Sequence, residues 1–163
     1  ADPGAEWAPS SYDVRHRATL SYILALPDSN PWTRPTQIQG VTTIASGLPF
    51  TPLLRFDNSN TGNVGGSTAG SDRPNLVGDP SVDSPSPDRW FNTAAFAIPA
   101  RYTFGNAGRN SLRGPGFASW DLAVSRRVPL RGDTALTLAL QTFNLFNRTN
   151  FDMPERYADE PST

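Results

Sequence analysis

Hydrophobic and polar residues alternate with a period of two along several separate stretches of the chain. The clearest stretch is 119–128, where Trp120, Leu122 and Val124 fall on one side and small or polar residues fall on the other. Alternation of this kind is typical of a β-strand with one apolar face. The same pattern predicts further strands at 15–26, 36–46 and 134–146.

Turn-forming residues connect these stretches into two antiparallel hairpins. Proline and polar residues fill 27–31, and a Pro-Leu-Arg-Gly-Asp sequence fills 129–133. Between the hairpins, 47–118 keeps no sustained period and is predicted to be one long irregular loop. We therefore expect an all-β chain with an extended lead at 1–14, hairpins at 15–46 and 119–146, the loop at 47–118, and a polar tail at 147–163.

Strand length and loop length both favour a segment of a transmembrane-type β-barrel or a multi-chain β assembly. A tilted strand needs about 9–11 residues to cross a bilayer. Membrane barrels combine short turns at one rim with long loops at the other, whereas a compact soluble domain seldom contains a loop as long as 47–118. Because so few strands cannot close a barrel, the outer strands keep open edges. Their expected partners are the remainder of a receptor barrel or further copies of the chain.

The strand at 134–146 is the edge that we expect to pair beyond its own hairpin. It contains no proline and no charged residue to block pairing. Its leucines Leu136, Leu138 and Leu140 mark this assembly edge. A change of phase near Thr142 indicates either a bulge or the point where the strand leaves the membrane. In a full receptor the partner would be a further last strand. In a chain that ends at Thr163 the partner would be the N-terminal lead or another copy, and we favour another copy because 1–13 has poor strand propensity. A proline at Leu138 is then expected to abolish assembly.

Across the strands, the apolar positions predict one shared apolar surface, which faces lipid in a receptor or a neighbouring chain in an assembly. Its expected members are Leu20, Tyr22, Leu24, Trp120, Leu122, Val124, Leu136, Leu138 and Leu140. The opposing threonine, serine, alanine and glutamine positions are then expected to face a lumen or solvent. Within 15–26, Ile23 is the residue that breaks the contrast between the two sides.

Composition excludes several classes of function. The 14 basic residues are all arginine, which excludes a P-loop lysine and a Schiff-base lysine. Cysteine is absent, which excludes disulfides, thiolate nucleophiles and cysteine-bound zinc. A net charge of -1 argues against a nucleic-acid partner.

The single histidine, His16, has no imidazole partner and is interpreted as a rim residue at a strand start. We expect no enzymatic activity and no cofactor, and the first residue, Ala1, indicates a processed product or a piece of a longer protein.

One segment of the loop is a candidate calcium site. Oxygen-bearing side chains at Asp57, Ser59 and Thr61, followed by Gly62, imitate the start of a calcium-binding loop. Position 12 of that loop is Thr68, where a bidentate glutamate is expected. The same residues also suit a turn stabilised by Asx hydrogen bonds.

An aromatic segment of the loop is a candidate ligand-contact site. The stretch 88–96 contains Trp90, Phe91 and Phe96 and is predicted to form one short helical turn. These aromatic rings suit stacking on a sugar or peptide ligand, but packing of the loop onto its own rim is the favoured interpretation, because such aromatics often anchor irregular loops.

Several blocks of sequence have a specific order and spacing. They are Asp13-Val14-Arg15-His16-Arg17, Ser46-Gly47-Leu48-Pro49-Phe50-Thr51, Arg73-Pro74-Asn75-Leu76-Val77-Gly78-Asp79-Pro80, Trp90-Phe91-Asn92-Thr93-Ala94-Ala95-Phe96, Phe104-Gly105-Asn106-Ala107-Gly108-Arg109-Asn110, Leu112-Arg113-Gly114-Pro115-Gly116 and Phe143-Asn144-Leu145-Phe146-Asn147-Arg148-Thr149-Asn150-Phe151. Together they resemble the later barrel strands of TonB-dependent outer-membrane receptors, in the Oar-like group that carries a carboxypeptidase-regulatory-like domain.

The resemblance implies a barrel segment of a receptor that takes up a bulky ligand by energy coupling, in the outer membrane or at the cell surface of a Gram-negative-type bacterium. Such receptors have about twenty-two strands, a plug and a TonB-contacting segment, and they end in a strand with a terminal aromatic. Residues 1–163 contain none of these further parts. The alternative hypothesis is a secreted or shed structural protein that assembles by inter-chain strand addition into a ring or an extracellular filament.

Overall fold

The computed structural model describes residues 3–27, 29, 35–62 and 72–159. The chain divides into two compact units. The sheet unit comprises Arg15–Ser46 and Gly116–Asn150, and the loop unit comprises Ala1–Val14, Gly47–Pro115 and Phe151–Thr163. Among the described residues, no helix is long and apolar enough to cross a membrane.

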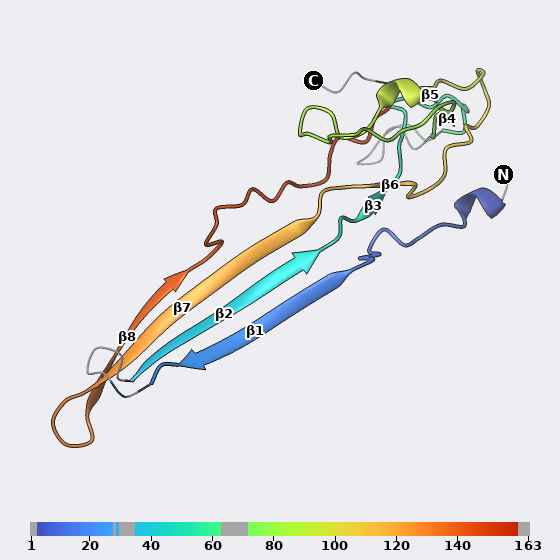
Figure 1. Ribbon diagram of the computed structural model, residues 1–163. Coiled ribbons are helices and arrows are strands. Elements are labelled where there is room, and N and C mark those ends of the chain that lie inside the picture. The colour runs from blue at the N-terminus through green and yellow to red at the C-terminus, as the bar shows by residue number, and fades with distance from the viewer. Residues whose placement is uncertain (1–2, 28, 30–34, 63–71, 160–163) are drawn as a thin grey trace. The chain divides into compact units, whose positions relative to one another are not determined.

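The sheet unit is one antiparallel sheet with the strand order β1-β2-β7-β8 (Figure 1). Its strands are β1 (Arg17–Ala25), β2 (Thr36–Ala45), β7 (Phe117–Pro129) and β8 (Ala135–Thr142). Both predicted hairpins are present, and the pairing of β2 with β7 joins them into a single sheet. The prediction of an all-β, antiparallel chain is confirmed.

The strand that was predicted at 134–146 ends earlier, at Thr142. The ladder breaks because Asn144 adopts the left-handed conformation, with φ of 48°. Contact with β7 resumes one residue later, where the Leu145 backbone N–H donates to the Trp120 carbonyl oxygen at 2.7 Å. The irregularity that the change of phase predicted near Thr142 is therefore present, and the regular strand stops at it.

The β7–β8 connection lies at the end of the sheet where β1 ends and β2 begins (Figure 1). In this connection, the Leu130 N–H donates to the Thr134 carbonyl at 2.9 Å, and Gly132 supplies the positive φ of 66° that the turn requires. The β1–β2 connection was predicted at 27–31, and most of that stretch lies outside the described residues. At the opposite end, His16 precedes β1 and exchanges hydrogen bonds with Ser46, as expected for a residue at a strand start.

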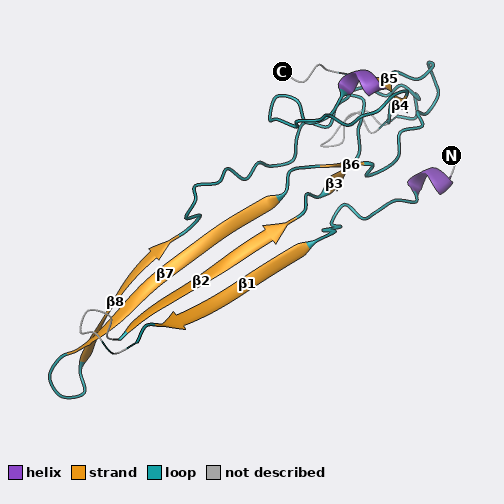
Figure 2. Ribbon diagram, viewed as in Figure 1, coloured by secondary structure: helices purple, strands orange, loops and turns teal. Residues whose placement is uncertain are grey.

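The loop unit contains only short regular elements (Figure 2). Its described elements are η1 (Pro3–Glu6), β3 (Pro49–Phe50), β4 (Asn75–Leu76), η2 (Thr93–Ala95), β5 (Phe96–Ala97) and β6 (Leu112–Arg113). The pairs β3–β6 and β4–β5 were not predicted, because strands of two residues are too short to show a period. The helical turn that was predicted in 88–96 is present as η2, whereas the lead, which was expected to be extended, begins with the 3-10 helix η1.

A small apolar core holds the loop unit together. Phe50, Leu54 and Phe91 are buried, and Pro52 and Pro74 are fully enclosed. Phe91 packs edge-to-face against Phe50, with ring centroids 5.9 Å apart. Burial of this kind explains how a segment with little regular structure keeps a defined conformation.

Candidate functional site

The register of the sheet determines which side chains share a face, because directly opposed residues of antiparallel strands point to the same side. One such row runs across all four strands and consists of Leu24, Ile38, Val124 and Leu140. The complete set that the sequence predicted lies on this side, which we call the apolar face: Leu20, Tyr22, Leu24, Trp120, Leu122, Val124, Leu136, Leu138 and Leu140. The prediction of one shared apolar surface is confirmed.

The apolar face is strongly exposed within the sheet unit. Leu20, Leu138 and Leu140 expose 63%, 55% and 69% of their surface. A soluble protein rarely exposes leucines in such a contiguous arrangement. The face therefore has the character of a surface that a nonpolar environment covers.

Gly40 has no side chain to contribute to the apolar face, and the Tyr22 ring fills the space above it. A Cβ atom at Gly40 would lie 2.4 Å from the Tyr22 Oη, so the phenol ring occupies the space above the glycine. Cross-strand packing of an aromatic ring over glycine restores contacts that the glycine cannot make itself.

The opposite side of the sheet, which we call the polar face, carries mostly small or hydrogen-bonding side chains. Its polar members include Gln37, Gln39, Thr43, Ser119, Asp121, Ser125, Thr137 and Gln141. Asp121 is the only acidic residue in the four long strands. Its Oδ1 accepts hydrogen bonds from the Asn144 backbone N–H at 2.8 Å and the Ser119 hydroxyl at 3.0 Å.

A hollow of about 350 Å³ lies on the polar face. Three large apolar side chains line it, namely Ile23 of β1, Val41 of β2 and Phe143, which directly follows β8. Its polar lining includes Gln39, Asp121 and Gln141. Ile23, the residue that broke the alternation in the sequence, is therefore part of a local apolar patch on the polar face.

The block at 143–151 forms a compact turn directly after β8, and its side chains bond to β7. The Asn144 side chain accepts from the Arg148 N–H and donates to the Arg148 carbonyl, at 3.0 and 2.9 Å. Asn150 does the same with the backbone of Ala118, at 2.9 and 3.0 Å. The Phe146 ring packs edge-to-face on Trp120, with centroids 5.3 Å apart. All of these hydrogen bonds and ring contacts are made within the sheet unit. The turn therefore terminates the sheet.

The predicted assembly edge lies on the last strand of the sheet. Leu136, Leu138 and Leu140 belong to β8, which pairs with β7 on one side. β1 forms the other outer strand. What pairs with these two edges stays a prediction.

The candidate calcium residues form a turn in the loop unit. Asp57 accepts from the backbone N–H groups of Gly62 and Thr61 at 2.8 and 3.2 Å, and from the Ser59 hydroxyl at 3.1 Å. Ser59 is itself held by the buried Asp72, whose Oδ2 accepts the Ser59 N–H at 2.6 Å. This geometry is that of an Asx-stabilised turn. Thr68, at the twelfth position of the calcium pattern, lies outside the described residues, and the described residues contain no cluster of three or more histidine and acidic ligands.

Hydrogen bonding also lowers the pKa of the Asp57 carboxyl in this turn. Desolvation raises the pKa of the Asp57 carboxyl, but donors from Gly62, Thr61 and Ser59 stabilise the carboxylate. Together the donors outweigh desolvation and hold the pKa of Asp57 below its ordinary value. The carboxylate form is therefore the one that stabilises the turn.

The candidate ligand-contact aromatics pack within the loop unit. Phe91 is buried and meets Phe96 edge-to-face at 5.8 Å. The Trp90 Nε1–H donates to the Arg113 carbonyl oxygen at 2.7 Å. Packing onto the loop, the alternative to ligand contact, accounts for Phe91. For Trp90 and Phe96, which are half-buried, ligand contact stays a prediction.

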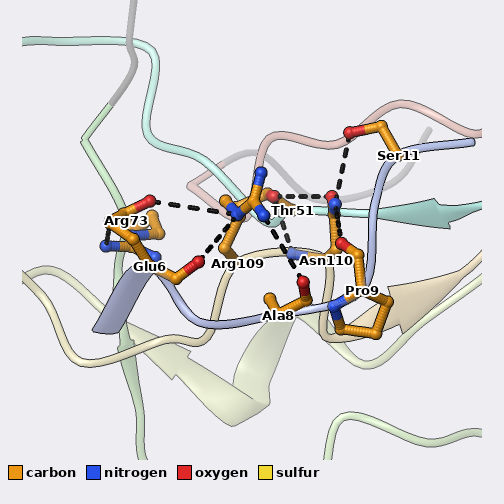
Figure 3. A network of polar contacts seen from close by, with 8 residues as sticks. All are labelled: Glu6, Ala8, Pro9, Ser11, Thr51, Arg73, Arg109 and Asn110. Carbon is orange, nitrogen blue, oxygen red and sulfur yellow. Dashed lines mark hydrogen bonds and ion pairs between the residues drawn. The ribbon is translucent and has the colours of Figure 1, made fainter. Parts of the chain in front are cut away.

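Polar side chains that sequence reasoning did not single out attach the lead at 1–14 to the rest of the loop unit (Figure 3). Arg109 donates to the backbone carbonyls of Glu6 and Ala8, at 3.2 and 3.4 Å. The Glu6 carboxylate forms an ion pair with Arg73. These contacts span about a hundred residues of sequence, from 6 to 109.

Asn110 and Arg113 complete this attachment, which we call the lead clamp together with Arg73 and Arg109. Asn110 is buried, and its Nδ2 donates to the Pro9 carbonyl at 2.7 Å. Arg113 donates to the Gly47 carbonyl at 3.1 Å and pairs with the Asp13 carboxylate at 2.5 Å. All four clamp residues belong to the sequence blocks that resemble the receptor family. The blocks therefore marked these residues as candidates, but they did not show which residues of the lead the clamp contacts.

The tail is attached to the loop unit by backbone pairing. Leu53 donates to the Arg156 carbonyl and accepts from the Ala158 N–H, both at 2.9 Å. The Arg55 guanidinium lies over the Tyr157 ring, 4.3 Å from its centroid. The polar tail predicted at 147–163 is therefore partly an ordered strand-like segment.

The chain was compared with known proteins and families. A family model described as an outer membrane beta barrel domain matches residues 1–163, the full sequence. No curated protein and no solved structure matches the chain.

Proposed function

The chain belongs to the outer membrane beta barrel domain family, and from this premise we propose that it forms four wall strands and one surface loop of a TonB-dependent receptor for a bulky ligand. Its location is the outer membrane of a Gram-negative-type bacterium. In the proposal, β1, β2, β7 and β8 cross the bilayer and the loop unit lies outside the cell. The partners are the other strands of the receptor barrel.

The division of the sheet into an apolar and a polar face carries this proposal. In a membrane barrel, side chains alternate between lipid and lumen along each strand. The leucines of the apolar face then meet lipid, and residues such as Gln39, Asp121 and Gln141 line the lumen. The strand lengths of 8 to 13 residues suit a bilayer crossing by tilted strands.

The connections support an outward-facing loop unit. Membrane barrels place short turns on the periplasmic side and long loops on the extracellular side. Here 130–134 is short, while Gly47–Pro115 is long and has its own core. The resemblance of the sequence blocks to Oar-like receptors supports energy-coupled uptake of a large ligand over passive diffusion.

The proposed role is non-catalytic. Structural hydrogen bonds reach the carboxylates of the candidate calcium turn, Asp57 and Asp72, and the strand carboxylate Asp121. Strand-forming and turn-forming roles account for them.

Uptake by intact cells tests the proposal. Cells with and without the protein are given labelled iron chelates, corrinoids, oligosaccharides and oligopeptides, with the proton-motive force intact or collapsed by a protonophore. We expect at least one ligand whose uptake requires both the protein and the proton-motive force. If uptake of every ligand is the same in the two strains, the receptor proposal is wrong.

The two open edges of the sheet favour one second candidate, a structural protein that assembles by strand addition between copies. In that case β8 of one copy pairs with an edge of another, and the symmetry decides between a ring and a filament. Sedimentation of the native protein distinguishes the candidates. A receptor sediments as a discrete membrane particle, whereas an assembly sediments as a large particle that Leu138→Pro disperses.

A further inference from the structure

The hollow on the polar face combines features that the proposed wall strands do not need. A lumen-facing surface is ordinarily polar, yet Ile23 exposes 73% of its surface there and Phe143 exposes 76%. Val41 lies diagonally across the β1–β2 ladder from Ile23, because Val41 pairs with Ser21 and Gln39 pairs with Ile23. Ile23, Val41 and Phe143 thus line one hollow together, while Phe117, the other exposed large apolar residue of this face, lies outside that lining.

The single strand carboxylate lies at the same hollow. Asp121 is opposite Val41 in the register and lines the hollow with it. Aspartate is disfavoured in strands, so its position calls for a reason. Part of the reason is structural, since Oδ1 accepts from Asn144 and Ser119. No hydrogen bond from the described residues reaches Oδ2.

The composition of the hollow defines the chemistry of its ligand. An exposed apolar floor gains free energy by burying an apolar group, and a carboxylate oxygen accepts hydrogen bonds from an ammonium or amide donor. The amides of Gln39 and Gln141 add neutral donors and acceptors at the rim. Small-molecule sites typically have this combination of an apolar lining with a few polar groups.

We infer that this hollow binds a cationic amphiphilic part of the ligand, in which an amine is adjacent to an aliphatic or aromatic group. The apolar group packs on Ile23, Val41 and Phe143, and the amine donates to Asp121. The inference rests on the proposed function, because it takes the polar face to line the path of the ligand. It adds a substrate class to that function and assigns the residues that select it.

Protection of a single cysteine tests the inference. Residues 1–163 contain no cysteine, so Ile23→Cys gives one reactive thiol in the hollow of the chain. The native protein carrying this substitution is reconstituted in nanodiscs, and its labelling by cationic 2-aminoethyl methanethiosulfonate is compared with labelling by the anionic 2-sulfonatoethyl reagent. We expect the cationic reagent to react about fivefold faster, which is the factor that one water-screened charge pair supplies at contact distance.

The ligand class is tested with matched competitors. 4-Phenylbutylamine, 4-phenylbutanol and 4-phenylbutyrate share a phenyl group and a chain but differ in charge. The amine is expected to slow labelling of the Ile23→Cys thiol more than the alcohol, and the acid least. Asp121→Asn keeps an oxygen acceptor for the Asn144 N–H, so the sheet is retained while the charge is lost, and the advantage of the amine should disappear.

Controls separate a site from general behaviour of the face. Ala139→Cys places a thiol on the same face of β8, outside the lining of the hollow, and should show neither charge preference nor protection. Equal protection by the amine and the alcohol, or no protection by either, overturns the inference. The readout is equilibrium binding without energy coupling, so a failure here is distinct from a failure of the uptake experiment.

Discussion

In the loop unit, Phe50, Leu54 and Phe91 are buried, whereas in the sheet unit Leu20 and Leu140 expose more than half of their surface. The loop unit is organised like a small soluble domain, with an apolar interior and polar side chains that bond to the backbone. The sheet unit is the reverse, because backbone ladders satisfy its hydrogen bonds and its apolar side chains point outward. The loop unit is therefore suited to water, and the sheet unit is suited to an environment that includes hydrocarbon.

The largest effect is expected from removing the core of the loop unit. Phe91→Ala deletes a buried ring that contacts Phe50 and Phe96, and such a deletion costs about 3–5 kcal/mol. The loop should unfold locally while the sheet remains, because the ring contacts of Phe91 are with Phe50 and Phe96 of the loop unit. Hydrogen exchange should show loss of protection in 47–115 only, and an equal loss in the strands would contradict the separation of the two units.

A charge on the apolar face should cost somewhat less. Leu122→Arg places a cation in hydrocarbon, at about 2–4 kcal/mol for a mid-bilayer position. Ser125→Arg, on the polar face of the same strand, is the matched control and should be much milder. Folding into lipid vesicles measures both. If the two variants cost the same, the assignment of the faces fails.

Breaking the lead clamp should have a moderate effect confined to the loop unit. Arg113→Ala removes the donors to the Asp13 carboxylate and the Gly47 carbonyl. Hydrogen bonds to a charged group contribute about 1.5–3 kcal/mol each at most, and partial exposure reduces this. Proteolysis of the lead should become faster, and Arg113→Lys should restore only part of the protection because lysine lacks the planar fork. Unchanged proteolysis would mean that the clamp does not hold the lead.

The smallest effect concerns pH. The folded pKa of Asp57 lies below its ordinary value of 3.8, so its turn is most stable above that pH and loses stability as the pH falls through the folded pKa. Exchange of the Gly62 and Thr61 amides, corrected for intrinsic rates, should therefore lose protection only in acid below 3.8. Asp57→Asn should remove this pH dependence. A loss of protection near neutral pH would show that another group controls the turn.

The sequence predicted the sheet unit well because its information is local. Alternation around Leu122 and Leu138 fixes the faces of the strands, and the change of phase near Thr142 marks where β8 ends. The sequence showed that Ile23 is an apolar exception on the polar side of its strand. Only the strand register shows that Ile23 lies near Val41 and Asp121.

The loop unit was harder because its information is non-local. Asn58, for example, donates to the carbonyls of Ala100 and Thr103 across more than 40 residues, and Asn110 reaches Pro9 across 101. No period in the sequence encodes such contacts, and they depend on the whole loop being folded. For the same reason the sequence kept ligand contact open for Trp90, Phe91 and Phe96 beside the favoured packing of the loop, and the structure buries Phe91 in the core.

In the proposed receptor, the apolar face meets lipid and the polar face meets the lumen. A cysteine scan along β7 from 120 to 126, in native protein reconstituted in nanodiscs, tests this arrangement directly, with spin labels read for contact with oxygen in lipid and with a nickel chelate in water. We expect 120, 122 and 124 to favour oxygen and 121, 123 and 125 to favour the chelate, in strict alternation. A profile without alternation, or one with the opposite phase, would contradict this arrangement.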